Sequence, residues 1–436
     1  MNIIQLGRFK ALFPKDFGQL RKSYNEVLHQ GTLSGDQLRD FRKAKLSSFL
    51  KHAKDNVPYW SEKMIAYSDK DILNAPVDVV SDLPVLTKDV FREEMDRMWA
   101  SNIEKFHIAT TGGTTGTPLV IHRDYNCDLI TKAYLIRARH NWGLEPWDKA
   151  VHLFSFGKAS LLGTIRMRLA NKKIGDAFPS SETERKKNFE LIETFKPKAL
   201  EGFATGLLTS VDMEGKQMNT GIPVIISTGE MLYSHQREQL EEYFGGKVYT
   251  YYGSNEVGSI AFDNEDQKLE VNRDHVLFDT VNESGKSVRN EEGRVVVTDM
   301  DNYAMPFIKY ELGDIAVLRD DKDLESQGRT IIHELLGRSQ DFLSGQDGRR
   351  LQATQLWGFL KDLKDIGHIQ FHQYDEDLIT IKLDGKGEET ERELEVVKSH
   401  LLERLGSVNI QIDRVDKIEK TKRGKQPLVI KKRPNS

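Results

Sequence analysis

The feature that most constrains the fold is an alternation of short β-like runs and helical runs between about residue 105 and residue 300. The apolar runs AVHLF, KALEGF, PVIIS and KVYTYY predict strands, and the amphipathic runs SETERKKNFELIETF and SHQREQLEEYF predict helices. The first of these helices begins with a capping-box pattern, Ser181 to Glu184, and the second stops at Gly245-Gly246. Such alternation predicts an α/β sheet covered by helices, with ligand sites at the loops that follow the strands.

Two sections of different character flank this region. Before it, QLRKSYNEVLHQ and the stretch after Ser34 predict helices, which end at Asn56-Val57-Pro58 because a residue before proline avoids helical angles. After Gly337-Arg338, the runs ATQLWGFLKDL (helix), LITIKL (strand), TERELEVVKSHLLERLG (helix) and VNIQIDRV (strand) predict a compact α+β unit. A chain of 436 residues is too long for one typical domain. We therefore expect a large N-terminal α/β domain with mixed sheets, residues 1–337, and a small C-terminal α+β domain, residues 338–436.

Composition narrows the classes of function. Hydrophobic residues (38%) and charged residues (30%) are those of a globular chain, and a net charge of −4 provides no overall positive field for nucleic acid or an anionic membrane. The first residues lack a secretory signal, and no apolar run approaches the ~20 residues that span a bilayer. The lone cysteine, Cys127, permits no internal disulfide and is expected to be inert, so a cytoplasmic location is the default expectation.

The strongest local signal is the threonine- and glycine-rich segment ATTGGTTGTP at residues 109–118. Its glycines let the backbone approach a ligand closely, and successive amide groups with threonine hydroxyls can surround a polyphosphate. A polar hairpin turn would have a similar composition, so the segment alone does not decide between the two. The kinase-type phosphate loop GxxxxGK[ST] occurs nowhere in the chain.

Four further segments combine turn glycines with charged side chains. VYTYYGSNE ends at Glu256, YELGD ends at Asp314, Gly337-Arg338 opens the tail domain, and KTKRGK ends at Lys425. Each alone could be a solvated turn. In this order and at these distances, the five segments together resemble the adenylate-forming superfamily of acyl-CoA synthetases and peptide-synthetase adenylation domains. The nearest branch is the phenylacetate-CoA-ligase-like one, which includes capsule-biosynthesis synthetases.

The resemblance extends from about Leu38 to Lys432. It implies an enzyme that activates a small-molecule carboxylic acid with ATP and Mg²⁺ as an acyl-adenylate, and then passes the acyl group to an acceptor, with coenzyme A as the first expectation. It also implies that the C-terminal domain is a lid that carries a mobile lysine. The net acidic charge predicts that the protein binds no nucleic acid. The oligomeric state, a homodimer included, is left open.

The resemblance also implies roles for individual residues. Glu256 would bind Mg²⁺, Lys425 would bridge the carboxylate and the α-phosphate, and Arg338 would assist near the ribose or the phosphates. The residues implied to hold the β- and γ-phosphates are Thr111, Gly113, Thr114, Thr115 and Gly116. Those implied to hold the adenosine part, with Tyr252 against adenine and Asp314 at the ribose hydroxyls, are Gly229, Glu230, Tyr252, Gly253, Ser254 and Asp314.

The sequence departs from the family pattern in three places. No lysine stands beside Pro118, Asn255 replaces the common threonine or serine, and Gln340 with the following SGQDGRRL differs from the segment typical of coenzyme A synthetases. Two alternatives therefore stay open. One is an adenylate-forming enzyme with another acceptor, such as the amine of a sugar or peptide, or a coenzyme that receives AMP; the other is a nucleotide-binding protein without catalysis.

The acid itself is not identified by the sequence. The segments that could line its pocket, and whose aromatic and small residues would suit a flat or short acid, are Ser155-Phe156-Gly157, Gly202-Phe203-Ala204 and Tyr251.

Overall fold

The computed structural model describes residues 3–104, 106–110, 119–154, 161–177, 182–211, 221–232, 234–338, 342–345, 349–352, 356, 359–360, 363, 366–375, 377–416, 418 and 428–431. Contacts between Cα atoms divide the chain into two compact units, which are described separately. The first unit extends to His333, and the second contains Glu334–Ser436 together with the short stretch Gly313–Val317. Among the described helices, none has the length and apolar character that crossing a membrane requires.

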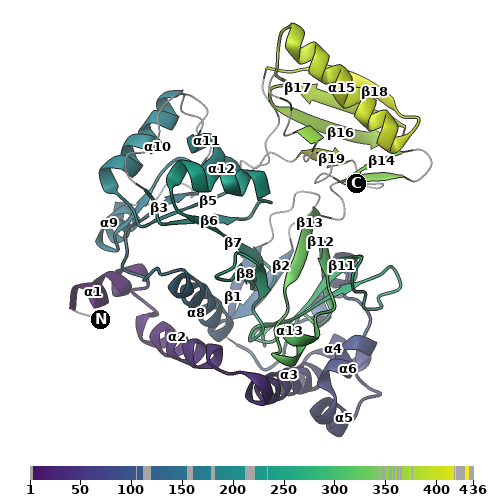
Figure 1. The fold of residues 1–436 in the computed structure, drawn as a ribbon. Coiled ribbons are helices and arrows are strands. Elements are labelled where there is room, and N and C mark those ends of the chain that lie inside the picture. Colours follow the sequence, from purple (N-terminus) through teal and green to yellow (C-terminus); the bar gives the residue numbers. More distant parts are fainter. Residues whose placement is uncertain are drawn as a thin grey trace. The chain divides into compact units, whose positions relative to one another are not determined.

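Helices form the opening section of the first unit (Figure 1). They are α1 (Ile3–Leu12), α2 (Phe17–Gly31), α3 (Gly35–Asn56), α4 (Pro58–Lys63), α5 (Asp69–Asn74), α6 (Pro76–Asp82), α7 (Lys88–Glu93) and the 3₁₀ turn η1 (Met95–Arg97). Helix α3 begins after Ser34 and ends at Asn56, so both predicted boundaries are confirmed, although the Ser34 side chain makes no capping hydrogen bond. Pro58 then opens α4, because proline at a first helical position loses no backbone hydrogen bond.

A seven-stranded sheet with the order β4-β3-β5-β6-β7-β8-β9 is the centre of the first unit. Its strands are β3 (Ala150–Leu153), β4 (Lys172–Ile174), β5 (Ala199–Gly202), β6 (Val224–Thr228), β7 (Lys247–Ser254), β8 (Gly258–Asp263) and β9 (Leu269–Val271). The four predicted strands are β3, β5, β6 and β7, which pair in parallel, whereas β7, β8 and β9 pair antiparallel. The expected α/β class with a mixed sheet is confirmed.

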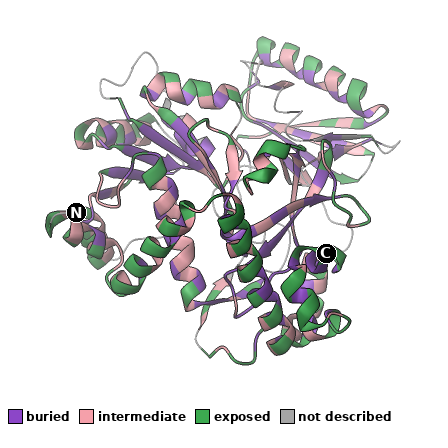
Figure 2. Ribbon diagram, turned by 60° about the horizontal axis from the view of Figure 1, so that its bottom comes forward, coloured by how far each residue is buried: buried purple, intermediate pink, exposed green. Residues whose placement is uncertain are grey.

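Helices cover both faces of this sheet. They are α8 (Tyr125–Asn141), α9 (Leu161–Leu169), α10 (Glu182–Phe195), α11 (Ala204–Val211) and α12 (Ser234–Phe244). Val151, Leu200 and Ile225 pack with α10, α11 and α12, whereas Ala150 and Ala199 pack on the other side against the end of α8. Figure 1 shows these helices on opposite sides of the strands, and Figure 2 shows mostly buried strands and helices with exposed outer faces. The alternation of side chains along each strand therefore places apolar groups on both faces.

Two further sheets precede the small C-terminal sheet along the chain. The antiparallel pair β1 (Phe106–Thr110) and β2 (Val120–Asp124) brackets residues 111–118, which lie outside the described residues. A four-stranded sheet has the order β10 (Val276–Val281), β11 (Glu292–Asp299), β12 (Tyr310–Leu318) and β13 (Ile332–Arg338), with the short helix α13 (Lys322–Ser326) after β12.

The second unit packs one long helix on a small sheet. It contains the pair β14 (Phe342–Ser344) and β15 (Arg350–Gln352), the strands β16 (Ile369–Asp375), β17 (Leu378–Leu383), β18 (Asn409–Arg414) and β19 (Val429–Lys431), and the helix α15 (Glu388–Leu405). The predicted strands β17 and β18 and the predicted helix are confirmed; the helix predicted at ATQLWGFLKDL falls mostly outside the described residues. Leu394, Val397, Leu401 and Leu405 form the buried face of α15, as their spacing predicted.

Strand β16 was not predicted, although it lies between β17 and β19 in this sheet. Its sequence, IQFHQYD, has a polar appearance, but Gln370, His372 and Gln373 are all buried. The Gln373 amide accepts a hydrogen bond of 2.8 Å from the Ser344 backbone N–H and donates one of 2.7 Å to the Ser344 carbonyl. Buried polar side chains are tolerated when they are hydrogen-bonded, which hydropathy alone does not reveal.

Candidate active site

The carboxyl ends of β6 and β7 bring two of the predicted segments side by side. In this parallel pair Thr228 lies opposite Tyr251, and Thr228 Oγ1 donates a hydrogen bond of 3.0 Å to the Tyr251 carbonyl. Gly229 and Glu230 follow the end of β6, and Tyr252 is the next residue of β7. Gly229 has a φ of +74°, a conformation that glycine adopts without strain. The residues predicted to surround adenine therefore lie just after β6 and on the neighbouring strand β7, at the edge where α/β sheets bind ligands.

A tight turn between β7 and β8 carries Glu256. A Cβ atom at Gly253 would lie 2.4 Å from the carbonyl oxygen of Gly258, so no larger residue fits there without displacing backbone. Ser254 Oγ accepts a hydrogen bond of 3.1 Å from the Val257 backbone N–H and closes the turn. The identities of Gly253 and Ser254 thus have a structural explanation beside their predicted role in nucleotide binding.

Glu256 is only 7% exposed, and its carboxylate meets groups from two distant segments. Tyr310 donates its hydroxyl to Glu256 Oε1 at 3.4 Å, and Lys88 Nζ lies 3.9 Å from the same oxygen. Burial, and then the charge of Glu256, raise the pKa of Tyr310, so this hydroxyl remains protonated and acts as a donor. The structure therefore joins the segment that ends at Glu256 to the segment YELGD that begins at Tyr310.

The surroundings of Glu256 fit a Mg²⁺ ligand. Mg²⁺ in nucleotide sites is usually held by one or two carboxylates together with substrate phosphates and water. Glu256 accepts from Tyr310 and faces Lys88 at 3.9 Å, and a carboxylate offers about four lone-pair sites, so its side chain has the donor chemistry of a Mg²⁺ ligand. Asp314, the predicted ribose ligand, lies half-buried on β12, the strand that Tyr310 begins.

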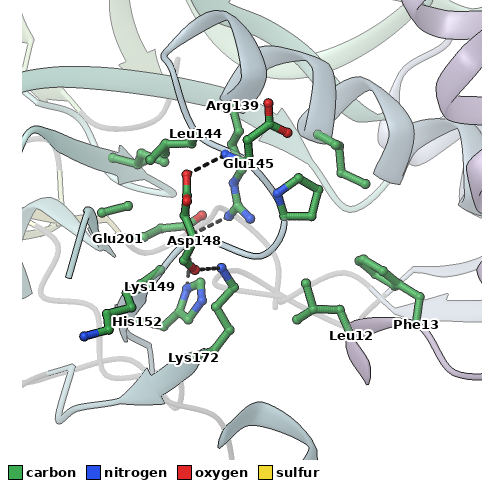
Figure 3. A pocket seen from close by; sticks show the side chains of 15 residues that line it. Leu12, Phe13, Arg139, Leu144, Glu145, Asp148, Lys149, His152, Lys172 and Glu201 are labelled. Carbon is green, nitrogen blue, oxygen red and sulfur yellow. Dashed lines mark hydrogen bonds and ion pairs between the residues drawn. The ribbon is translucent and has the colours of Figure 1, made fainter. Parts of the chain in front are cut away.

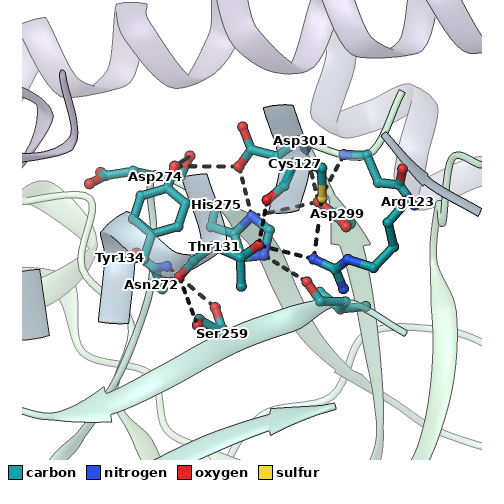
Figure 4. A network of polar contacts seen from close by, with 12 residues as sticks. Arg123, Cys127, Thr131, Tyr134, Ser259, Asn272, Asp274, His275, Asp299 and Asp301 are labelled. Carbon is teal, nitrogen blue, oxygen red and sulfur yellow. Dashed lines mark hydrogen bonds and ion pairs between the residues drawn. The ribbon is translucent and has the colours of Figure 1, made fainter. Parts of the chain in front are cut away.

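A buried polar network that contains Arg123 and His275 (Figure 4) also contacts the backbone of the Glu256 turn. Arg123, at the end of β2, donates from Nη1 to the carbonyl oxygens of Asn255 at 3.3 Å and Glu256 at 3.5 Å. His275 Nε2 lies 2.9 Å from the carbonyl oxygen of Val257. Neither Arg123 nor His275 was predicted, because neither stands in a recognisable local motif. Arg123 contacts a segment 132 residues away, and His275 contacts the Glu256 turn only after the chain has folded.

His275, Asp299 and Asp301 have the residue types of a metal site, but their hydrogen bonds indicate a structural role. Burial favours protonation of Asp301, yet Lys45, at 2.6 Å, and the hydrogen-bonded His275 together outweigh burial and lower the pKa of this carboxyl group. His275 Nδ1 lies 2.7 Å from Asp301 Oδ2, and Nε2 lies 2.9 Å from the Val257 carbonyl oxygen. Both ring nitrogens therefore already have protein partners, as in a histidine that holds the fold together.

A second polar cluster lines a cavity of about 140 Å³ on the α8 face of the seven-stranded sheet (Figure 3). Glu201 Oε2 accepts from Arg139 and lies 3.1 Å from His152 Nδ1. Burial favours the neutral acid, but the charges of Arg139 and His152 outweigh it and hold the pKa of Glu201 at about 2. Burial lowers the pKa of Lys172, which donates to the Asp148 carbonyl at 2.6 Å, to about 8. The cluster is therefore a buried ion pair with a neighbouring, weakly basic lysine.

The predicted acid-pocket segments are only partly described. Glu201 immediately precedes Gly202-Phe203-Ala204, and the rings of Phe203 and Phe154 meet edge to face with centroids 5.3 Å apart. Tyr251 donates or accepts a hydrogen bond of 3.3 Å with Ser259. Residues 155–157 lie outside the described residues.

Several predicted site residues also lie outside the described part of the chain, so their roles stay predictions. They are Thr111, Gly113, Thr114, Thr115, Gly116 and Lys425, together with the side chain of Arg338. Cys127 is described: burial raises the pKa of its thiol well above the ordinary value, in agreement with the expectation of an inert cysteine.

Comparison with known proteins gives relatives over most of the chain. Residues 343–432 match the family model of the CapK C-terminal domain. Protein CapK of Staphylococcus aureus is 23% identical over 411 residues, which cover 91% of this chain and 89% of that protein. Indoleacetate–lysine synthetase of Pseudomonas savastanoi is 26% identical over 253 residues (55% of this chain, 61% of that protein). Phenylacetate-coenzyme A ligase of Escherichia coli is 24% identical over 329 residues (72% and 74%).

Solved structures show the same fold at lower sequence identity. 2-Hydroxyisobutyryl-CoA ligase, in its postadenylation state with an acyl-AMP, superimposes with a TM-score of 0.69 and 16% identity, covering 90% of this chain and 89% of that one.

Proposed function

We propose that this chain, a relative of CapK and of phenylacetate-CoA ligases with the adenylate-forming ligase fold, activates a carboxylic acid with ATP as an acyl-adenylate. The observation that carries the proposal is the hydrogen bond between Tyr310 and Glu256 beside the paired ends of β6 and β7. This hydrogen bond links residues that are 54 positions apart in the sequence. The buried Glu256 carboxylate thus has the Tyr310 hydroxyl and the Lys88 ammonium group as neighbours. Carboxylate oxygens are the side-chain ligands that Mg²⁺ uses in nucleotide sites.

In the proposed reaction the carboxylate of the acid attacks the α-phosphorus of ATP, and pyrophosphate leaves. Mg²⁺ held by Glu256 would neutralise charge on the phosphates. Tyr252, with Gly229 and Glu230, would hold adenine, and Asp314 would accept hydrogen bonds from the ribose hydroxyls. The segment at residues 111–116 would hold the leaving pyrophosphate, and Lys425 and Arg338 would stabilise the charge that develops.

We also propose that residues 338–436 act as a lid. Acyl-adenylates hydrolyse readily, so a closing domain that excludes water would protect the intermediate until the acceptor arrives. We place the reaction in the cytoplasm, because a chain with one cysteine has no internal disulfide to maintain.

Coenzyme A is the acceptor that we propose first, in keeping with the phenylacetate-CoA ligases among the relatives. An amine is the second candidate. The relatives include an indoleacetate–lysine synthetase, and the CapK C-terminal model matches residues 343–432, the region whose sequence departs from coenzyme A synthetases.

ATP–pyrophosphate exchange, measured over a panel of aryl, short acyl and amino acids, tests the first half-reaction. Acid-dependent exchange would support adenylation, and the absence of exchange with every acid would favour a nucleotide-binding protein without catalysis. The acyl-adenylate made from the best acid is then offered coenzyme A, lysine or an amino sugar in single-turnover reactions. Faster consumption with one acceptor identifies its class, and consumption equal to hydrolysis for coenzyme A would reject the thioester proposal.

A further inference from the structure

Helix α9 directs an apolar stripe toward solvent. Leu162, Ile165 and Leu169 stand at i, i+3 and i+7 and therefore share one face of the helix. Their exposed fractions are 80%, 46% and 63%. An amphipathic helix on a globular protein normally turns such a stripe to the core. An apolar stripe that faces solvent instead is typical of a surface that binds a partner.

Helix α1, next to α9, adds two exposed isoleucines. It contacts α9, and Figure 1 shows the two helices next to each other at the edge of the first unit. Ile3 and Ile4 of α1 are 85% and 63% exposed. We use the name α1–α9 surface for the five side chains Ile3, Ile4, Leu162, Ile165 and Leu169.

The segments that carry the α1–α9 surface contain basic residues but no acidic ones. Residues 3–15 and 161–174 contain seven Lys or Arg residues and no Asp or Glu, although the whole chain has a net charge of −4. Lys10, Lys15, Arg166 and Arg168 are exposed, whereas Lys172 is buried. Arg166 stands four residues after Leu162 and three before Leu169, so a cation lies beside the apolar stripe itself.

Another group of exposed aliphatic side chains is surrounded by residues of mostly negative charge. Ile65, Leu73 and Val77 are 83%, 61% and 49% exposed, so this group is comparably apolar. Residues 61–82 around it contain five Asp or Glu residues and two Lys. The α1–α9 surface therefore combines exposed aliphatic side chains with positive charge, whereas the group around Ile65 combines them with negative charge.

We propose that the α1–α9 surface docks on the surface of a membrane that contains anionic lipids. Aliphatic side chains enter the boundary between headgroups and acyl chains, and neighbouring Lys and Arg side chains attract the negative headgroups. A second copy of the chain fits this surface less well. A symmetric dimer would place the same basic patch against itself, and like charges across an interface are unfavourable.

The test is sedimentation of the full chain with vesicles of phosphatidylcholine alone or with added phosphatidylglycerol. We expect binding to the anionic vesicles at low ionic strength, weaker binding as salt rises, and little binding to phosphatidylcholine. The double variant Arg166→Glu/Arg168→Glu should bind at least about tenfold more weakly, because each basic residue near an anionic surface contributes severalfold to binding. Leu162→Ser/Leu169→Ser should also weaken binding about tenfold, because two apolar side chains no longer insert.

The matched control is Ile65→Ser/Leu73→Ser, which removes exposed aliphatic side chains from the acidic area and should leave vesicle binding unchanged. Thermal melting of every variant shows whether the fold is retained. No binding of the native chain to anionic vesicles at low salt would overturn the proposal, as would equal loss in the control. A concentration-dependent dimer that Leu162→Ser/Leu169→Ser dissociates, without vesicle binding, would assign the surface to a second copy instead.

Discussion

Replacing Arg139 by methionine should destabilise the first unit at neutral pH, because the buried Glu201 carboxylate would lose its main cation. Arg139 contacts Glu201 Oε2, and only 5% of Glu201 is exposed. The charges of Arg139 and His152 overcome the effect of burial and lower the pKa of Glu201 from its ordinary 4.5 to about 2. A native pKa below the unfolded one stabilises the fold above pH 4.5, and this stabilisation is lost as the pH falls from 4.5 toward 2.

The size of the effect follows from this shift. At about 1.4 kcal/mol for each pKa unit, the charged interactions of Glu201 contribute on the order of 3 kcal/mol at neutral pH. Removing one partner of a buried pair typically costs about 3–5 kcal/mol, because the other charge is left in an apolar environment. We therefore expect Arg139→Met to lower the free energy of unfolding by about 3 kcal/mol at pH 7. The deficit should shrink as the pH is lowered and Glu201 becomes protonated.

Urea unfolding followed by tryptophan fluorescence suits this measurement. Four of the five tryptophans, Trp60, Trp99, Trp142 and Trp147, belong to the first unit. The double variant Arg139→Met/Glu201→Gln should regain part of the loss, because it leaves no buried charge behind. Arg392→Met is the matched control, since Arg392 pairs with Glu389 on the exposed face of α15 and should matter little. A deficit that is the same at pH 7 and pH 4, or no recovery in the double variant, would refute the electrostatic argument.

Three variants address the proposed reaction. Glu256→Gln should nearly abolish Mg²⁺-dependent ATP–pyrophosphate exchange at an unchanged melting temperature, and native exchange rates would remove the metal role. Asp314→Ala should raise the KM for ATP through loss of a charge-assisted acceptor, typically ~1.5–3 kcal/mol, whereas an unchanged KM with a lower melting temperature would indicate a structural turn residue. Lys425→Ala should slow adenylation much more than it weakens ATP binding and should spare acyl transfer from a preformed acyl-adenylate. Equal damage to both half-reactions would contradict a lysine that moves with the lid.

Local sequence patterns predicted the regular elements with strong periodicity. The parallel strands β3, β5, β6 and β7 and the helix α15 were identified because their apolar residues recur at the strand or helix period. Strand β16 was missed, because its buried Gln370, His372 and Gln373 look like surface residues until their hydrogen-bond partners are known. Polar residues in a core depend on tertiary partners, which a local pattern does not contain.

By itself, the sequence determined the α/β class and the order of the glycine-bearing segments, because propensity, turn chemistry and motif spacing are local properties. The tertiary structure decided which segments meet. It placed Thr228, just before Gly229, opposite Tyr251, just before Tyr252, and it brought Tyr310 to Glu256 across 54 residues. It also showed that Arg123 and His275 hold the Glu256 turn and that the α9 stripe faces solvent. These contacts depend on the order of the strands and on packing between segments far apart in the sequence. No single segment contains the information that decides which strands and side chains become neighbours.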